Sequence, residues 1–243
     1  MSVNKPQVNP PDSWAFFDKI YCISLLNRAD RREQARQQFA KVGLLARVEF
    51  VVMAKHPDNP EHGIFISHMH CLQKGLDAGA ENILVFEDDV VFQRYTPGLI
   101  PAVTHALQLL ADWNALFLGG ITSGSQKTGH KNLVKITYRC LAHAYALNRL
   151  FAQEIAQLTW SDIPFDEVLR RHNRDFYAVY PMCAFQGPAS SDNKTVAIDR
   201  IRRICGGLLF IQTINEFYQN HRRILQFSLL FLLALAVLAL IVW

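Results

Sequence analysis

The stretch Ile83-Leu84-Val85-Phe86-Glu87-Asp88-Asp89-Val90 runs from four apolar residues directly into three acids. An uninterrupted apolar run of this kind is typical of a strand that is buried on both faces, as in a sheet covered by helices. The acids then lie at the strand's C-terminal end, where open α/β sheets place their ligands. Crowded carboxylates are costly to ionise near an apolar strand. A divalent cation such as Mg²⁺ or Mn²⁺ would relieve that cost, whereas a solvated acidic turn would need no ligand, and both readings stay open.

The segments around this strand alternate between apolar runs and helical patterns, which indicates an α/β layered domain. The chain contains no G-x-G-x-x-G after its first strand and no G-x-x-x-x-G-K-[ST], so classical dinucleotide and P-loop binding are disfavoured. The polar, glycine-containing residues 122–131 are expected to form a loop. Strands are expected over residues 17–26, 48–53, 83–86, 115–118, 134–137 (an edge strand) and 176–181, and helices over residues 31–42, 66–78, 100–111, 164–171 and part of 142–158.

The composition sets broad limits on the class of protein. The 243 residues suffice for one sizeable core, and the formal net charge is +4. Basic residues are not interleaved with aromatic ones, so no nucleic-acid partner is expected. The five cysteines are scattered, and none forms a C-x-x-C pair. They suggest neither a zinc site nor a disulfide framework, and reduced thiols in a cytosolic domain fit best.

The two ends of the chain differ from its middle. Residues 1–13 are polar and proline-containing, and we expect a flexible arm without a signal peptide. Residues 224–243 carry no charged side chain and would extend about 30 Å as a helix, which predicts a transmembrane span. The basic residues just before it would keep the domain of residues 14–205 in the cytoplasm. Residues 206–223 form a basic, amphipathic juxtamembrane segment, lying on the membrane or packed on the domain as a linker helix.

Six segments in order resemble family 25 glycosyltransferases, which include bacterial lipooligosaccharide galactosyltransferases and, more distantly, collagen galactosyltransferases. The resemblance runs over about residues 19–192, and residues 84–90 are similar to the family's LEDDV core motif. Ser24 replaces the family's usual Asn, and Leu26 and Asn27 replace typical polar and basic residues, so the first loop is the most altered. Ile64 replaces the family's usual Cys. The other matching segments are residues 20–32 (IYVINL-x-R-x-x-DR), 63–68 (GC-x-x-SH), 142–147 (T-x-AY-x-I), 163–166 (P-x-D) and 180–192 (P-x-x-x-Q…S).

The resemblance implies a GT-A-like α/β/α domain that binds a nucleotide sugar, with a divalent ion (Mn²⁺ or Mg²⁺) bridging the donor's diphosphate to the acids. Alternate residues of a strand share a face, so Glu87 and Asp89 are expected on one face and Asp88 on the other. We expect Glu87 and Asp89 at the metal, with Asp89 as the preferred ligand. Asp88 is expected to contact the donor, although Asp88 or Glu87 could hold the ribose or a water beside the metal.

An inverting transfer also needs a general base for the acceptor hydroxyl. Asp166 is the predicted base and Glu167 the runner-up, although Asp166 could equally be an ordinary acid at a helix start. Each of the other predicted donor-binding residues has one of three features: a position at a helix start, a cationic side chain, or a polar group in the closing motif. They are Ser67, His68, Arg28, Arg31 and Gln186, with Arg32 and Tyr145 as weaker candidates; the competing roles are helix capping, core packing and a solvated arginine-rich face.

The sequence therefore predicts a membrane-anchored hexosyltransferase on the cytoplasmic face of a bacterial inner membrane. It would transfer a hexose, with galactose expected, from a UDP-sugar to a lipopolysaccharide-core or other lipid-linked glycan. Two alternatives stay open: a metal-dependent nucleotidyltransferase that uses the same acids, and a degenerate, non-catalytic glycan-binding or scaffold protein at the membrane.

Overall fold

A computed structural model describes residues 12–110, 112–187 and 207–242. The predicted arm therefore lies almost wholly outside the described residues, as does the end of the closing motif beyond Gly187. The strands of the main sheet are β1 (Lys19–Leu25), β2 (Val48–Met53), β3 (Asn82–Glu87), β5 (Ala115–Phe117), β6 (Ile121–Lys127), β7 (Leu133–Cys140), β8 (Ala144–Asn148) and β9 (Phe176–Val179). The helices are α1 (Ala29–Lys41), α2 (Pro60–Asp77), α3 (Leu99–Gln108), α4 (Arg149–Ala156), α5 (Phe165–Arg171) and α7 (Gly207–Val242), with a 3-10 turn at Leu45–Arg47.

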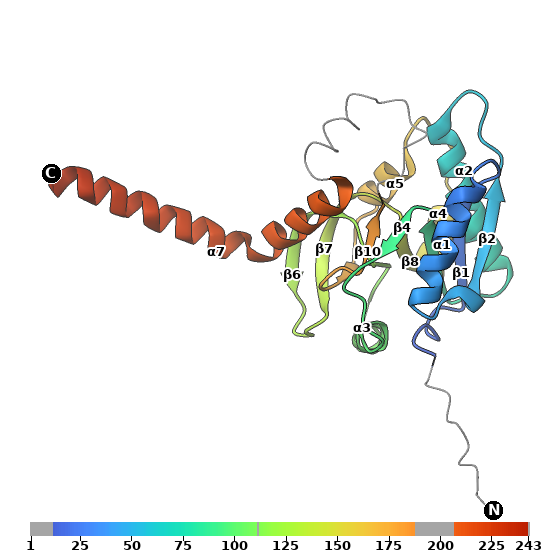
Figure 1. Cartoon of the computed structure of the whole chain (residues 1–243), viewed down its shortest axis with the longest axis horizontal. Helices are drawn as coiled ribbons and strands as arrows, with labels where there is room; N and C mark the ends of the chain where they lie inside the picture. Colours follow the sequence, from blue (N-terminus) through green and yellow to red (C-terminus); the bar gives the residue numbers. More distant parts are fainter. Residues whose placement is uncertain (1–11, 111, 188–206, 243) are drawn as a thin grey trace, which may run out of the picture.

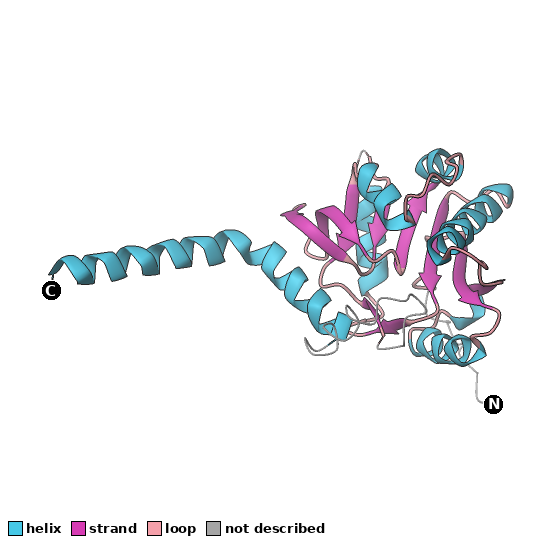
Figure 2. Cartoon of the chain, turned by 90° about the horizontal axis from the view of Figure 1, so that it is seen from above, coloured by secondary structure: helices cyan, strands magenta, loops and turns pink. Residues whose placement is uncertain are grey.

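The main sheet has the strand order β2-β1-β3-β8-β5-β9-β7-β6. The pairs β1–β2, β1–β3 and β5–β9 are parallel, and the other neighbours are antiparallel. A separate two-stranded antiparallel sheet joins β4 (Val90–Phe92) to β10 (Ala184–Gln186). Figure 2 shows helices on both sides of the main sheet. The predicted α/β class is confirmed, with a sheet of mixed rather than purely parallel strands.

Strand β3 lies in the interior of the sheet and is buried on both faces, as its apolar run predicts. Ile83 and Val85 pack into the core that also contains residues of α2, α4 and α5, whereas Leu84 and Phe86 pack into the core shared with α1 and α3. Each face therefore receives every second side chain. This double burial fixes the register of β3 and holds the acids at its C-terminal end at the rim of the sheet.

The prediction of a loop over residues 122–131 is wrong, because most of this segment is β6. Strand β6 pairs antiparallel with β7 and has register shifts beside Thr122 and Gly124. Its side chains are polar and largely solvent-facing, so no apolar run marks it as a strand. Strand β7 lies between β9 and β6, so it is not the edge strand that the sequence predicts.

Helix α2 begins earlier than the sequence pattern indicates. Its N-cap is Asn59, whose side-chain oxygen accepts hydrogen bonds from the backbone N–H groups of Glu61 (3.0 Å) and His62 (3.2 Å). Pro60 occupies the first helical turn, where a missing N–H costs nothing. Ser67 and His68 consequently lie inside α2, so the prediction that they sit at a helix start is wrong.

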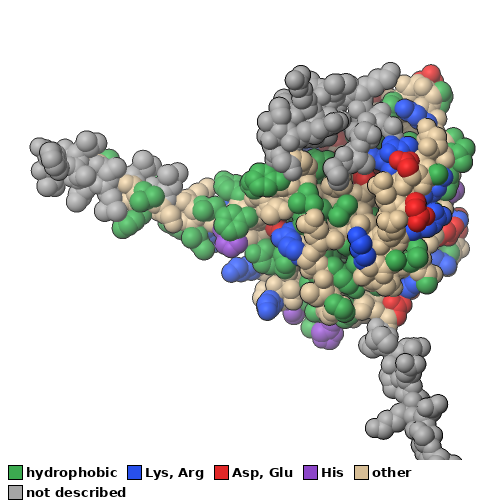
Figure 3. Space-filling view, viewed as in Figure 1, with side chains coloured by type: hydrophobic (Ala, Val, Ile, Leu, Met, Phe, Trp, Pro, Cys, Tyr) green, Lys and Arg blue, Asp and Glu red, His purple; other side chains and the backbone are tan. Residues whose placement is uncertain are grey.

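Helix α7 packs on the domain with its first turns and then extends away from it (Figure 1). The extended part exposes large hydrophobic side chains such as Ile224, Phe227 and Phe231. Figure 3 shows hydrophobic side chains along the helix where it leaves the domain. Within the part of the chain that the structure describes, no helix has the length and apolar character needed to cross a membrane. The predicted transmembrane helix over residues 224–243 is therefore unsupported; Trp243 and several side chains of that range lie outside the described residues.

Candidate active site

A cavity of about 300 Å³ opens beside the C-terminal end of β3. Its wall is built by the ends of β1 and β10, by the first two turns of α2, by the start of α5 and by Leu208 of α7. The predicted site residues that line it are Arg31, Ser67, His68, Glu87, Asp89, Asp166 and Gln186. Arg28 and Asp88 are absent from the lining. Residues scattered over 155 sequence positions, from Arg31 to Gln186, thus meet at one opening.

Burial makes the three acids costly to ionise, and Arg31 offsets part of that cost. Burial raises the pKa of Glu87 to about 7 and also raises the pKa of Asp88. For Asp89, burial and then the charge of Glu87 raise the pKa. Arg31 Nη1 lies 3.2 Å from Asp88 Oδ1, and Arg31 Nη2 lies 3.7 Å from Asp89 Oδ2. One guanidinium is therefore shared between two buried carboxylates.

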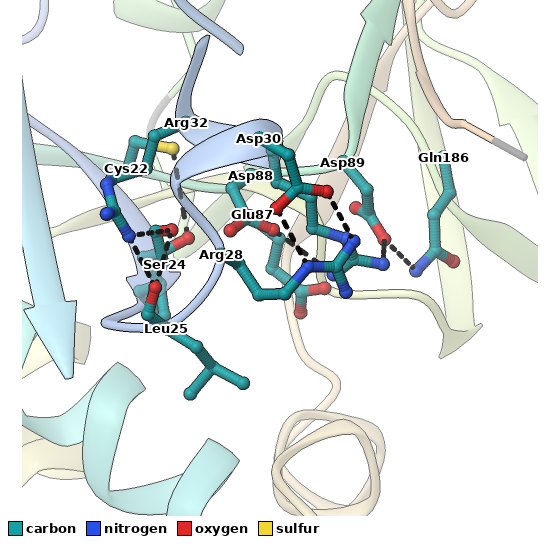
Figure 4. Close-up of polar contacts among 12 residues, drawn as sticks. Cys22, Ser24, Leu25, Arg28, Asp30, Arg32, Glu87, Asp88, Asp89 and Gln186 are labelled. Carbon is teal, nitrogen blue, oxygen red and sulfur yellow. Dashed lines mark hydrogen bonds and ion pairs between the residues drawn. The ribbon is translucent and has the colours of Figure 1, made fainter. Parts of the chain in front are cut away.

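The neighbouring arginines have other roles. Arg28 pairs with Asp30 at 3.0 Å, and Figure 4 shows this pair beside the acids. Arg32 donates a hydrogen bond to the carbonyl oxygen of Leu26 (3.2 Å) and to that of Leu25, so it holds the end of β1. Of the three arginines, Arg31 is the one that reaches the cavity.

The small sheet brings Gln186 to the acids. Strand β4 follows the acidic turn directly, and β10 pairs with it so that Gln186 lies opposite Val90. Gln186 Nε2 donates a hydrogen bond of 2.9 Å to Asp89 Oδ2 (Figure 4). Gly119 permits this approach, because a Cβ there would lie 1.8 Å from the carbonyl oxygen of Ala184. The sequence pattern predicts neither β4 nor β10, and both are strands of three residues.

His68 is held as a neutral imidazole. Its ring stacks on Phe165 with centroids 4.1 Å apart, and its Nδ1 lies 2.9 Å from the Tyr145 hydroxyl oxygen. Burial lowers the pKa of His68 to about 3. Its Nε2 lies 3.5 Å from Glu87 Oε1, so the imidazole contacts Glu87 without carrying a charge at neutral pH. Ser67, its neighbour, donates to the carbonyl oxygen of Gly63 within α2 (2.7 Å).

Asp166 holds the loop between β7 and β8. Its Oδ1 accepts hydrogen bonds from the Tyr138 hydroxyl and from the backbone N–H of Ala142 (2.9 Å), and its Oδ2 accepts one from the backbone N–H of Leu141 (3.0 Å). Leu141 has a backbone φ of +75°, which residues other than glycine rarely adopt. Asp166 lies in the first turn of α5, and Pro164 is the N-cap. The runner-up, Glu167, pairs instead with Arg170 and Arg171.

His143 is a cavity residue that the sequence reasoning missed. It is fully buried, with Nε2 3.3 Å from the carbonyl oxygen of Ala184 and Nδ1 3.2 Å from that of Leu141. The segment of residues 142–147 already contains it, but a histidine directly before an apolar strand gives no signal that separates a site residue from a packed one.

A divalent cation would need ligands from the donor as well as from the chain. Within residues 12–110, 112–187 and 207–242, no three His, Cys, Asp or Glu side chains are grouped closely enough to hold a metal ion alone. Asp89 Oδ1 and Gln186 Oε1 are nevertheless buried and have no hydrogen-bond partner among the described residues. Mg²⁺ is commonly bound by one or two carboxylates together with substrate phosphates. The oxygens present therefore fit a cation that arrives with a diphosphate.

Comparison with known proteins supports the resemblance given by the motifs. No protein-family model matches the chain. Among curated proteins it is similar to a human (Homo sapiens) protein named inactive glycosyltransferase 25 family member 3, with 26% identity over 199 residues. That match covers 69% of this chain and 33% of the relative, so the chain spans about a third of the relative's length. The similarity to glycosyltransferase family 25 that the motifs indicate is thereby confirmed.

Two solved glycosyltransferase structures align with the chain at low similarity. One acts in glycosylation of the major capsid of PBCV-1 (TM-score 0.39, 11% identity, 66% of this chain and 81% of that one). The other is a mannosyltransferase from Pyrobaculum calidifontis in complex with GDP-Man and Mn²⁺ (TM-score 0.40, 12% identity, 90% of this chain and 68% of that one). Overlaps of this size do not by themselves define a common fold.

Proposed function

We propose that the chain is a glycosyltransferase that binds a nucleotide-sugar donor, a UDP-hexose with galactose expected, in the cavity beside Asp89. The observation that carries the proposal is the group of Arg31, Asp89 and Gln186, which lies in the wall of a cavity of about 300 Å³. Arg31 supplies a planar guanidinium suited to phosphate oxygens. The similarity to family 25 supports a GT-A-like arrangement of donor and acids.

A divalent cation fits this site if Asp89 Oδ1 provides one ligand and the donor's diphosphate provides others. Such a cation would stabilise the negative charge that develops on the departing nucleotide. The residues of the chain would then position the sugar. In an inverting transfer the bond from the anomeric carbon to the phosphate oxygen breaks, a bond to the acceptor oxygen forms, and the acceptor's proton passes to a carboxylate of the cavity.

Two carboxylates of the cavity compete for that proton. Asp166 is the sequence prediction, but its oxygens already accept three hydrogen bonds that hold residues 138–142. Glu87 lines the same cavity and makes a 3.5 Å contact with the neutral imidazole of His68. Asp166 is therefore still the proposed general base, and Glu87 is the alternative base that the geometry adds.

The acceptor is proposed to be a lipopolysaccharide-core or other lipid-linked glycan at the cytoplasmic face of a bacterial inner membrane. Exposed hydrophobic side chains on α7 beyond Arg223, among them Ile224 and Phe227, support contact with a lipid surface. Cell fractionation tests this part: the chain should sediment with membranes, and recovery wholly in the soluble fraction would contradict it.

The test of donor use is release of UDP by the full chain, measured with a panel of UDP-sugars and Mn²⁺. One UDP-hexose should give release above background, and Asp89→Ala should abolish it. A folded protein that releases UDP from none of the donors would contradict catalysis. Binding of a donor without release would instead support a non-catalytic, nucleotide-sugar-binding relative, which the name of the human protein also favours.

A further inference from the structure

The first turns of α7 carry a stripe of polar side chains that face the domain. Gln212, Glu216 and Asn220 recur every four residues, and Asn215 follows Gln212 by three, so these side chains share one face of the helix. Gln212 is fully buried and Glu216 is 4% exposed. Of the two placements that the sequence leaves open for this segment, on the membrane or packed on the domain, its described first turns are packed on the domain through specific hydrogen bonds.

Two residues of this stripe, Asn215 and Asn220, hold the edge of the main sheet. Asn215 Oδ1 accepts a hydrogen bond from the backbone N–H of Thr122 (2.9 Å), and Asn215 Nδ2 donates to the carbonyl oxygen of Thr122 (2.9 Å). Asn220 Oδ1 accepts from the Ser125 hydroxyl (2.7 Å). These contacts satisfy groups of β6, the edge strand, and explain why a polar strand is stable there.

The other two residues of the stripe, Gln212 and Glu216, hold the small sheet that carries the site. Glu216 Oε2 pairs with Arg94, just after β4, at 2.8 Å, and Glu216 Oε1 accepts a hydrogen bond from the backbone N–H of Met182, just before β10. Gln212 Oε1 accepts from the backbone N–H of Gln186 (3.0 Å). Helix α7 thus ties down both strands of the β4–β10 pair.

A single residue, Gln186, connects Gln212 to the acids. Gln186, whose backbone Gln212 holds, donates through its side chain to Asp89 Oδ2 (2.9 Å), and the backbone N–H of Gly187 donates to the carbonyl oxygen of Asp89 (2.7 Å). Leu208, one turn before Gln212, lines the cavity itself. Packing alone would favour an apolar residue at position 212, because Gln212 Nε2 is buried without a hydrogen-bond partner among the described residues.

We propose that Gln212 is a positioning residue of the nucleotide-sugar site: it fixes Gln186, which orients Asp89, so that α7 is an integral part of the site. The inference rests on the proposed function for the identity of the ligand, but the arrangement of α7, β10 and the acidic turn is independent of it. Loss of the Gln212 acceptor frees the backbone of Gln186, and Asp89 then loses its fixed orientation.

The first test uses hydrogen exchange of the full chain and needs no ligand. Gln212→Leu keeps the volume of the side chain but removes the acceptor. Amides of residues 182–187 should exchange at least tenfold faster in this variant, whereas Asn220→Ala, a change on the same face that contacts β6, should leave them unchanged. Equal exchange in Gln212→Leu and the unmodified chain would overturn the inference, whatever the protein binds.

The second test measures binding of UDP-galactose with Mn²⁺ by calorimetry. We expect Gln212→Leu to raise the Kd about tenfold, a change of about 1.4 kcal/mol. In a Gln186→Ala background the same substitution should change the Kd less than about twofold, because residues that act through one contact are not additive. Equal losses in both backgrounds would show a general structural effect and overturn the positioning role. No binding by the unmodified chain would contradict the proposed function instead, and hydrogen exchange would still decide the inference.

Discussion

Replacing Arg31 by methionine tests whether one guanidinium supports the acidic turn. The side chain of Arg31 is 12% exposed and those of Asp88 and Asp89 are 6% exposed. Removing one partner of a buried ion pair costs about 3–5 kcal/mol, because the remaining charge is uncompensated. The raised pKa values of Asp88 and Asp89 let these acids take up protons, so we expect the lower end, about 3 kcal/mol.

In thermal unfolding, a loss of about 3 kcal/mol corresponds to a Tm lower by about 6–12 °C for a chain of this size. The loss should grow as the pH rises, because the uncompensated carboxylates ionise. The control is Arg36→Met on the same helix, since Arg36 pairs with Glu33 at 3.6 Å on the surface and such pairs contribute about 0–1 kcal/mol.

Adding a divalent cation gives a second measurement on the Arg31→Met variant. If the acids bind Mn²⁺ together with a diphosphate, the cation takes over the role of the missing guanidinium, so in the presence of UDP, Mn²⁺ at ~100 times its Kd should restore about 2.7 kcal/mol. Arg31→Met should therefore gain more Tm from Mn²⁺ than the unmodified chain. An Arg31→Met protein as stable as the Arg36→Met control would refute the account of the buried pair, and a Tm that Mn²⁺ leaves unchanged in the presence of UDP would refute the cation site.

Three further predictions concern the elements around the site. Gly119→Ala should force β10 away, because the new Cβ would overlap the carbonyl oxygen of Ala184; we expect a loss of about 1–3 kcal/mol in urea unfolding, and an unchanged midpoint would contradict the close approach. Burial raises the pKa of the Glu216 carboxyl, so the folded chain binds this proton more tightly than the unfolded chain, and stability should fall as the pH rises from 4.5 through the raised pKa. Glu216→Gln should flatten this dependence of Tm on pH, and an unaltered curve would rule out Glu216 as its source. If Glu87 is the base, Glu87→Gln should lower kcat for UDP release at least 100-fold. If Glu87→Gln stays active and folded Asp166→Asn shows that loss instead, the base is Asp166.

The sequence predicts the centre of the domain better than its periphery. The run of residues 83–86 identifies a strand buried on both faces, and the predicted bounds of β2 coincide with the observed Val48–Met53. Such strands are read from apolar runs because burial selects those side chains. Strand β6 has polar side chains and is stabilised from outside by Asn215 and Asn220, so no local pattern marks it.

The candidate site follows the same division. The motifs indicate the acids, Arg31 and Gln186 because these residues stand in recognisable order along the chain. They do not indicate that Arg31 lies between Asp88 and Asp89, since that depends on how α1 packs beside β3. The role of Asp166 in holding the loop after β7 and the contact of Gln212 with Gln186 are also properties of tertiary structure. Local sequence carries no signal for either.

The central claim is that the cavity beside Asp89 binds a nucleotide sugar. Calorimetric titration of the full chain with UDP-galactose, UDP-glucose and UDP-N-acetylglucosamine in the presence of Mn²⁺ tests it most directly, with Asp89→Ala as the matched variant. The account predicts saturable binding of at least one donor, lost in Asp89→Ala while the variant stays folded. Absence of binding for every donor by the folded chain, or equal binding by Asp89→Ala, would contradict it.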